Sequence, residues 1–527
     1  MICYIKDNYN SWVFRENEME VDYSCNPMDS KLFDGDVLDG GKLVYSPTRS
    51  QKNIPGVLIL DNNRTYGRTD NKKRLYYKCK PNNPLLPHFL LPFDISIGFC
   101  KHFKNKFVTF QFVAWTEKHP IGVIQQNLGD VDNLTAFYEY QLYSRNLHIP
   151  ISESITRCKQ KLKENTVHHY QSLILEDEKR FGTIVRIDQP IFSIDPPGCT
   201  DRDDAISMQI LKDEFEVTVY IANVWVWLEA LELWDVIGTR VSTIYFPDKK
   251  RSMLPSQLEA LCSLDENQEK FAIATTFRIS NDWKCEASTP FQCLIRVSKN
   301  YDYDTALLKN KTMTKMMEIT RNLDGTVQDT HQLIAYWMTQ TNRAAALQLR
   351  REKTGIFRCV SGTHNPLLCI WEQHISGRYA AFDEQLDLAH CMLGYSEYVH
   401  STSPIRRLVD LANQMMQVAT LSLDAKRFLS AIDISKMNQD MKSIKKVQTN
   451  SNLLFQITTF PDLLEKPLKG IVIEVDAGKG TVYLEEIKWI VRVRTERFYE
   501  PSTEVECRLF LLSNEAQMYK KVRATII

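Results

Sequence analysis

Four aspartates lie within ten residues in the middle of the chain. They are Asp195, Asp201, Asp203 and Asp204. Carboxylates this close repel each other and resist ionisation, and a hard divalent cation removes that cost. Mg²⁺ and Mn²⁺ both prefer carboxylate and water oxygens. Two such ions held by shared carboxylates are a common arrangement for phosphodiester hydrolysis. The cluster therefore predicts a metal-dependent nuclease site.

Two other interpretations of this cluster stay open. The segment Pro196-Pro197-Gly198 opens a turn, and acid-rich turns are common on solvated surfaces. A calcium loop is a second alternative, but the spacing lacks the alternation and the terminal glutamate of an EF-hand. The cluster alone does not separate a nuclease site from a solvated turn.

A second motif predicts a phosphate site. Ser403 followed by Pro404 is typical of a helix start, with a hydroxyl cap and proline in the first turn. Arg406 and Arg407 would then stand where the helix dipole disfavours cations. An anion bound there would explain them, because free N–H groups and a guanidinium make a phosphate clamp. The alternative is that Arg406 pairs with Asp410 at i+4.

The bulk composition is that of an ordinary globular protein with several domains. The chain has 527 residues, 43% hydrophobic and 25% charged, with zero formal net charge, which neither favours nor excludes a nucleic-acid partner. No apolar run reaches the roughly 18–20 residues that span a membrane, and no secretory or transit signal is evident. Thirteen dispersed cysteines without a CxxC pair indicate reduced thiols. We expect a cytoplasmic protein, with the nucleus as the alternative.

The order of predicted elements is β, β, α/β, β. Short strands broken by turns fill the first 160 residues or so, including an alternating strand at 107–115. Small OB barrels fit this part, although any small barrel or sandwich fits the periodicity equally. The middle mixes a strand at 216–222 with a helix from 330 to 349, capped by Asp329 or Thr330. The end returns to strands at 470–475, 481–484 and 490–494.

The two motifs together resemble the signatures of the RNB family, which comprises the RNase II, RNase R and exosome-associated exoribonucleases. Residues 193–205 resemble the first signature and residues 398–407 the second. Further landmarks of the family stand between them in the expected order, at 220–224, 243–247, 253–255 and 261–264. The N-terminal part is similar to tandem cold-shock OB domains around 89–94 and 115–122.

The resemblance implies a multidomain α/β plus all-β fold, in which a central RNB α/β catalytic domain is flanked by OB-type barrels. We expect OB or cold-shock-like domains at 1–65 and 66–165, the RNB domain at 166–447 and a C-terminal RNA-binding OB barrel at 448–527. The implied activity is Mg²⁺-dependent (alternatively Mn²⁺-dependent) 3′→5′ hydrolysis of single-stranded RNA to 5′-mononucleotides by a two-metal mechanism. The alternative is a weakened or inactive RNA-binding protein on the same scaffold.

The resemblance also assigns roles to individual residues. The four aspartates would bind the metal, and loss of Asp203 would abolish cleavage while sparing RNA binding. Arg406 would contact the scissile phosphate, and Tyr303, with Tyr301 as a competitor, would position the 3′-terminal nucleotide. The implied RNA-binding residues are Tyr245, which would stack on bases, with His400, Thr402, Ser403, Arg406 and Arg407.

Several positions depart from the family pattern. Met338 is preceded by Ala335-Tyr336 where the family has a Glu-Glu pair, so an acid of the reaction centre is missing. Asn223 replaces an aspartate, Asn413-Gln414 replaces His-Arg, and the segment after Tyr303 is short. Such divergence would suit a large DNA virus or a fast-evolving eukaryote. It puts turnover and processivity in question more than the reaction type.

Overall fold

The computed structural model describes residues 1–69, 73–94, 103–212, 214–238, 240–303, 305, 310–361, 377–418, 421–476, 478–514 and 519–527. The chain divides into two compact units. The first comprises residues 1–148, 246–249 and 445–527, and the second comprises 149–245 and 250–444. No helix in the described ranges is both long and apolar enough to cross a membrane.

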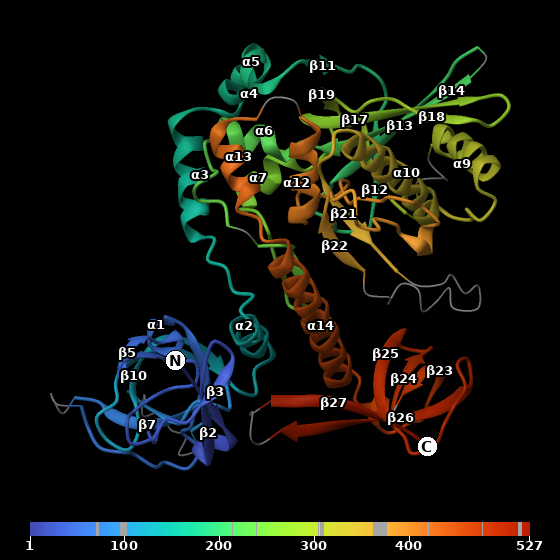
Figure 1. The fold of residues 1–527 in the computed structure, drawn as a ribbon. Coiled ribbons are helices and arrows are strands. Elements are labelled where there is room, and N and C mark those ends of the chain that lie inside the picture. Colours follow the sequence, from blue (N-terminus) through green and yellow to red (C-terminus); the bar gives the residue numbers. More distant parts are fainter. Residues whose placement is uncertain are drawn as a thin grey trace. The chain divides into compact units, whose positions relative to one another are not determined.

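The N-terminal part of the first unit holds an open sheet and a closed barrel (Figure 1). The open sheet has the order β3-β2-β1-β4-β5 and consists of β1 (Ile2–Lys6), β2 (Ser11–Glu16), β3 (Met19–Val21), β4 (Val37–Asp39) and β5 (Lys42–Tyr45). The barrel has the order β10-β8-β7-β6-β9 and consists of β6 (Ile54–Leu58), β7 (Leu75–Pro81), β8 (Phe89–Phe93), β9 (Lys106–Ala114) and β10 (Ile121–Asp130). Phe33 joins the two cores by stacking on Phe89 and Trp115, at centroid distances of 5.8 and 4.8 Å.

The predicted boundary at residue 65 is wrong. β6 pairs with β7 and β9, so residue 65 falls inside the barrel rather than between two domains. The turn-rich stretch after β6 resembles a linker in sequence, and the pairing of Gly56 with Pro81 and with Val108 shows that β6 belongs to the barrel. The first β unit is also an open sheet rather than a barrel. The predicted strand at 107–115 is confirmed as β9.

A second closed barrel lies at the C-terminal end of the first unit. Its order is β23-β24-β25-β27-β26, formed by β23 (Leu468–Asp476), β24 (Lys479–Leu484), β25 (Trp489–Arg494), β26 (Glu504–Asn514) and β27 (Tyr519–Ile526). Both closed barrels share one connectivity, including a parallel pairing of the third and fifth strands. This five-stranded arrangement is that of an OB-type barrel. The three predicted C-terminal strands correspond to β23, β24 and β25.

The second unit is built on an eight-stranded sheet with the order β11-β19-β17-β14-β13-β12-β20, to which β18 adds by pairing with β17. Its strands are β11 (Ile184–Arg186), β12 (Phe192–Asp195), β13 (Asp204–Ile210), β14 (Glu214–Ala222), β17 (Glu269–Ser280), β18 (Cys285–Ala287), β19 (Phe291–Arg296) and β20 (Lys299–Asp302). The apolar side chains of β12–β14 pack against α9 (Lys311–Leu323) and α10 (Thr330–Arg351). Trp337 of α10 is fully buried in this core.

The predicted long helix is confirmed as α10. The Asp329 carboxylate accepts a hydrogen bond from the Gln332 amide at 2.8 Å, so Asp329 is the cap. The smaller pairs of strands are β15 (Ile244–Tyr245) with β16 (Lys250–Arg251) and β21 (Ile356–Cys359) with β22 (Arg378–Ala381). The other helices are α1 (Pro47–Ser50), α2 (Leu134–Ser144), α3 (Ser152–Glu164), α4 (Val167–Glu176), α5 (Glu178–Phe181), α6 (Val224–Ala230), α7 (Ser256–Cys262), α12 (Leu408–Gln417), α13 (Leu423–Ser430) and α14 (Ile434–Thr459).

Candidate active site

The four aspartates meet where two neighbouring strands end. Asp195 closes β12 and Asp204 opens β13, and these strands pair at Phe192 and Ile206. The intervening loop carries Asp201 and Asp203. Three of the carboxyl groups are nearly buried, with 9%, 8% and 2% exposure for Asp195, Asp201 and Asp203. Carboxylates at this depth need specific partners, which excludes a freely solvated turn.

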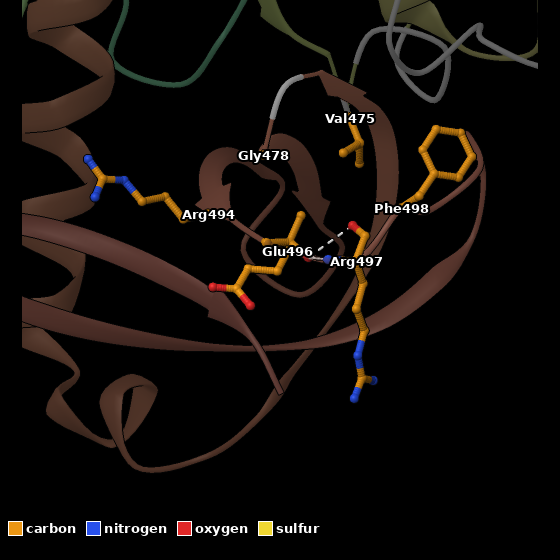
Figure 2. Close-up of a pocket in the computed structure, with 7 residues that line it drawn as sticks. Val475, Gly478, Arg494, Glu496, Arg497 and Phe498 are labelled. Carbon is orange, nitrogen blue, oxygen red and sulfur yellow. Dashed lines mark hydrogen bonds between the residues drawn. The ribbon is translucent and has the colours of Figure 1, made fainter.

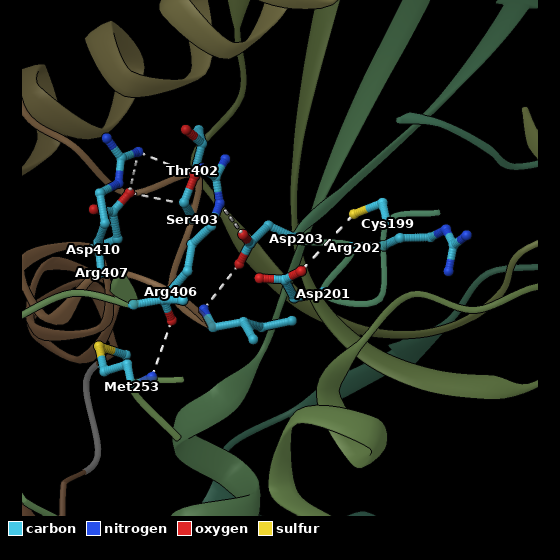
Figure 3. A network of polar contacts seen from close by, with 12 residues as sticks. Cys199, Asp201, Arg202, Asp203, Met253, Thr402, Ser403, Arg406, Arg407 and Asp410 are labelled. Carbon is cyan, nitrogen blue, oxygen red and sulfur yellow. Dashed lines mark hydrogen bonds and ion pairs between the residues drawn. The ribbon is translucent and has the colours of Figure 1, made fainter. Parts of the chain in front are cut away.

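The two sequence signatures contact each other directly at Asp203 (Figure 3). Arg406 donates from Nε to Oδ2 of Asp203 at 2.8 Å, and the Ile405 amide donates to Oδ1 at 2.8 Å. The Arg406 side chain remains 42% exposed, whereas that of Asp203 is 1% exposed. Among the described residues, the two Nη groups of Arg406 have no hydrogen-bond partner. They are available to an anion.

The predicted helix start at Ser403 is wrong. Residues 404–406 form a turn, and α12 begins at Leu408. The Ser403 amide donates to Oδ1 of Asp410 at 2.8 Å, and the Arg406 carbonyl accepts from the Thr243 amide at 2.9 Å. The Arg406 carbonyl would accept from the amide of residue 410 in a continuous helix, and its bond to Thr243 instead overrides the Ser-Pro signal. Arg406 therefore lies outside the first turn of α12, immediately before its N-cap residue Arg407.

Arg407, rather than Arg406, pairs with Asp410. Its Nη2 lies 2.9 Å from Oδ1 of Asp410 and 3.0 Å from Oγ of Ser403. Its Nη1 lies 3.4 Å from Nδ1 of His400, which also contacts the Tyr379 hydroxyl at 2.8 Å. Burial and then the neighbouring Arg407 hold the pKa of His400 well below its ordinary value, so the ring is neutral.

Three residues predicted to bind RNA thus form the inner support of the signature loop. His400 and Ser403 are engaged with Arg407, and Thr402 is only 4% exposed. Their contact with RNA stays a prediction.

Tyr245 and Lys250 both hold Asp201. The Tyr245 hydroxyl donates to Oδ2 at 3.0 Å, while the residue as a whole is 40% exposed. Nζ of Lys250 lies 3.3 Å from Oδ1 of Asp201, 3.4 Å from Oε2 of Glu259 and 2.9 Å from Oγ1 of Thr200. No sequence pattern indicates Lys250, because its position depends on the pairing of β15 with β16.

Arg202 stands within the acidic loop and ties it to the segment after α7. Its Nη1 lies 2.8 Å from Oδ1 of Asp265, and its Nε lies 3.6 Å from Oδ2 of Asp195. Sequence reasoning missed this residue, although an arginine among four aspartates is itself a signal for an internal ion pair.

Tyr303 lies beside the aspartates. It follows β20, in which Asp302 pairs with Asp195 of β12. Burial, with contributions from Asp204 and Asp195, raises the pKa of Tyr303 to about 12, so its hydroxyl keeps its proton. The ring of Tyr301 instead packs against Phe192 at 5.8 Å. The ring of Tyr303 packs against His331 at 5.2 Å, and the influence of Asp204 and Asp195 on its pKa favours Tyr303 over Tyr301 as the residue of the site.

The electrostatics of the cluster fit a divalent cation. Burial raises the pKa of Asp203 to about 7, although Arg406 and the Ile405 amide partly offset the rise. Burial, then Asp195 and Asp203, raise the pKa of Asp204 well above its ordinary value. The Asp204 carboxyl group has no hydrogen-bond partner in the described ranges. Oxygen donors that oppose one another's ionisation in this way suit Mg²⁺ or Mn²⁺.

The aspartates do not form a preformed cage. Across the described ranges, no group of three or more His, Cys, Asp or Glu side chains is gathered closely enough to hold a metal ion as it stands. Protein donors also hold both oxygens of Asp201 and both of Asp203. The residues fit a metal by their chemistry, and binding would require some of these contacts to change.

The positions that depart from the family pattern have structural contacts. Ala335 is exposed on α10, and Tyr336 packs edge-on against Trp337 at 5.1 Å. Asn223 donates to Gln292 at 2.9 Å, and Asn413 donates to the carbonyl groups of Ile356 and His400 at 2.9 Å. The stretch 335–337 supplies no carboxylate to the site.

Comparisons with known proteins agree with this geometry. A family model described as the RNB domain matches residues 186–318. The chain is 28% identical over 193 residues to the probable exosome complex exonuclease RRP44 of Caenorhabditis elegans, which is 36% of this chain and 20% of that protein. The match therefore spans about a fifth of the length of this curated relative.

Solved structures share the fold. The RNase R of Mycoplasma genitalium, solved in complex with ribose-methylated single-stranded RNA, has a TM-score of 0.69 at 16% identity, and the match covers 100% of both chains. Yeast Ssd1, described as a pseudonuclease, has a TM-score of 0.56 at 13% identity over 88% of this chain and 67% of that one. With the two signatures joined at Asp203, these matches show that residues 186–318 form an RNB domain and that the chain shares the fold of RNase R, with OB-type barrels on either side of that domain in the sequence.

Proposed function

We propose that the chain is a metal-dependent 3′→5′ exoribonuclease that degrades single-stranded RNA to 5′-mononucleotides. The observation that carries the proposal is the contact of Arg406 with Asp203, which places two uncommitted Nη groups beside the four aspartates. A guanidinium oriented through Nε can present both Nη groups to phosphate oxygens. The geometry suits an anion bound next to a metal site, which is the arrangement that phosphodiester hydrolysis needs.

The chain's own residues would divide the work as follows. The aspartate oxygens would hold Mg²⁺ or Mn²⁺, which supplies an activated water and stabilises the leaving oxygen. Arg406 would bind the scissile phosphate, with its Nε fixed by Asp203. The protonated hydroxyl of Tyr303 would hydrogen-bond to the 3′-terminal nucleotide. The use of two ions belongs to this proposal.

Binding of the RNA strand would use stacking and charge. Tyr245 is 40% exposed while Asp201 fixes its hydroxyl, and stacking of a base on its ring would not depend on the RNA sequence. On the C-terminal barrel, Arg494, Arg497 and Phe498 line a hollow (Figure 2), and Phe498 is 78% exposed. Cations beside an exposed aromatic ring are the usual elements of a single-strand binding surface.

The test uses single-stranded RNA labelled at its 5′ end. With Mg²⁺, the full chain should produce a descending ladder that ends in short products. Asp203→Asn should stop shortening but leave RNA binding within about threefold, because the substitution removes one charge at the metal site and keeps the shape. The matched control is Asp282→Asn, since Asp282 lies in an exposed turn, where it pairs with Lys284 and accepts from the Ser280 hydroxyl. This control should cleave normally.

The alternative is an RNA-binding protein that has lost hydrolysis. Two observations favour it: α10 lacks an acid at 335–337, and the fold is also that of yeast Ssd1, a pseudonuclease. Tight RNA binding without any shortening, in either Mg²⁺ or Mn²⁺, would assign this alternative and overturn the nuclease proposal. A ladder that persists unchanged in Asp203→Asn would instead point to a contaminating nuclease.

A further inference from the structure

A buried amide in the middle of α10 contacts the second signature at four points. Asn342 is 3% exposed. Its Oδ1 accepts from the amide of Ser401 at 2.8 Å and from the Ser401 hydroxyl at 3.2 Å. Its Nδ2 donates to the Tyr398 hydroxyl at 3.0 Å and to Oγ1 of Thr402 at 3.4 Å. Because a backbone amide can only donate, the Ser401 contact fixes which end of the side chain is Oδ1.

The segment that Asn342 holds leads directly to the reaction centre. Beyond Thr402, only Ser403 and Pro404 precede Ile405 and Arg406, which bind the two oxygens of Asp203. Figure 3 shows Thr402, Ser403 and Arg406 along this path. At its other end the segment is fixed where the Arg406 carbonyl accepts from the Thr243 amide at 2.9 Å. Asn342 therefore anchors the near side of a short irregular segment at Ser401 and Thr402, next to His400, whose carbonyl accepts from Asn413.

We infer that Asn342 is a positioning residue that sets where Arg406 stands relative to Asp203. This inference goes beyond the proposed function, on which its catalytic part rests. Loss of the amide leaves the Ser401 N–H without a partner and lets the segment shift against α10. A displacement of about 1 Å in a group that contacts the reacting phosphate can slow a reaction about a hundredfold. Affinity for RNA should hardly change, because stacking and other phosphate contacts remain.

The experiment compares Asn342→Ala with Gln348→Ala in the full chain. Gln348 is a matched control, because it is a buried amide on the same helix, 9% exposed, and bonds along the helix to Glu352 at 3.0 Å. We expect Asn342→Ala to lower kcat about 30- to 100-fold with Kd for RNA within about threefold. Gln348→Ala should lower kcat by less than about threefold. Hydrogen exchange at the Ser401 amide should become faster in Asn342→Ala alone.

A double-mutant comparison separates positioning from general loss of stability. In an Arg406→Ala background, Asn342→Ala should lower kcat by less than about a further threefold, since the guanidinium that Asn342 positions is already absent. Three results would overturn the inference. They are the same decrease in kcat of about 30- to 100-fold in the Arg406→Ala background, an equal decrease in Gln348→Ala, and unchanged hydrogen exchange at the Ser401 amide in Asn342→Ala. If Asn342→Ala does not fold, Tyr398→Phe removes one of its partners and should show a smaller effect in the same direction. If the unmodified chain does not cleave RNA, the proposed function fails, and the exchange comparison still decides whether Asn342 holds the segment.

Discussion

Arg406 donates from Nε to Oδ2 of Asp203 at 2.8 Å, a contact between residues 203 positions apart in the sequence. It uses one edge of the guanidinium and leaves the Nη groups exposed. The carboxylate is thus a fixed support for a cation that can still bind phosphate. Several consequences can be measured.

Arg406→Ala should slow cleavage far more than it weakens binding. A charged contact made mainly in the transition state is worth about 2–4 kcal/mol, which predicts a loss of about 30- to 1,000-fold in kcat. Arg406→Lys should recover little, because an ammonium group cannot pair with Asp203 and present a planar fork to phosphate at once. Single-turnover rates and filter binding with the same RNA would measure this, and equal losses in rate and affinity would show that Arg406 is only a general phosphate contact.

Arg407→Ala should lower the stability of the folded chain. Asp410 is fully buried, and without Arg407 its charge would lose its ion-pair partner. Breaking such a buried pair costs about 3 kcal/mol. We expect a clearly lower denaturant midpoint, measured by circular dichroism in urea, and a smaller decrease for Arg406→Ala, because the Arg406 side chain is 42% exposed and that of Arg407 is 23% exposed. The reverse ranking of the two variants would contradict the assignment of Arg407 as a support.

Substitutions at Tyr245 should distinguish the contribution of its ring to RNA affinity from that of its hydroxyl. Tyr245→Ala removes a stacking surface worth about 1–3 kcal/mol, so RNA affinity should fall about 5- to 150-fold. Tyr245→Phe keeps the ring and frees one oxygen of Asp201, so affinity should be retained. Fluorescence anisotropy with a labelled single strand measures both. Similar affinities for the two variants would mean that no base stacks on this ring.

Stabilisation by Mg²⁺ should grow with pH. The Asp203 carboxyl group keeps its proton up to about pH 7 in the folded chain, against 3.8 for its ordinary value. Its contribution to metal-free stability is therefore present at low pH and is lost as pH rises through about 7. Mg²⁺ needs the ionised form, so the Tm increase on adding Mg²⁺ should be larger at about pH 8 than at about pH 6. An increase that is the same at both values would count against metal binding at Asp203.

Removal of Lys250 should strengthen metal binding. Its ammonium group lies 3.3 Å from Asp201 and competes with any cation for that carboxylate. Lys250→Met should raise the affinity for Mn²⁺ about two- to fivefold in isothermal titration, a gain typical of removing one partly exposed counter-charge. Lys284→Met, which removes an exposed lysine paired with Asp282, should have no effect. Weaker metal binding in Lys250→Met would show that the lysine orients Asp201 instead of competing for it.

The sequence alone determined the local elements and the chemistry of the candidate site. The alternation of apolar and polar residues predicted β9, and the helical pattern with a cap at Asp329 or Thr330 predicted α10. Both patterns depend only on residues close in the chain. The spacing of the aspartates indicated a cation site, since repulsion between carboxylates depends on their number and proximity. Ser403 and Pro404 misled for the same reason: they carry a local signal for a helix that distant residues override.

The tertiary structure decided which side chains meet. Arg406 faces Asp203, whereas Arg407 turns inward to Asp410. This difference follows from hydrogen bonds of the backbone at 403–407 with Asp410 and Thr243. Contacts between residues far apart in sequence likewise decided three other features. They are the position of residue 65 inside the first barrel, the contact of the Lys250 ammonium group with Asp201, and the hydrogen bonds of Asn342 to the second signature. A sequence pattern indicates which secondary structure each segment prefers. The buried polar groups of a folded site need hydrogen-bond partners, and distant segments of the packed chain supply them.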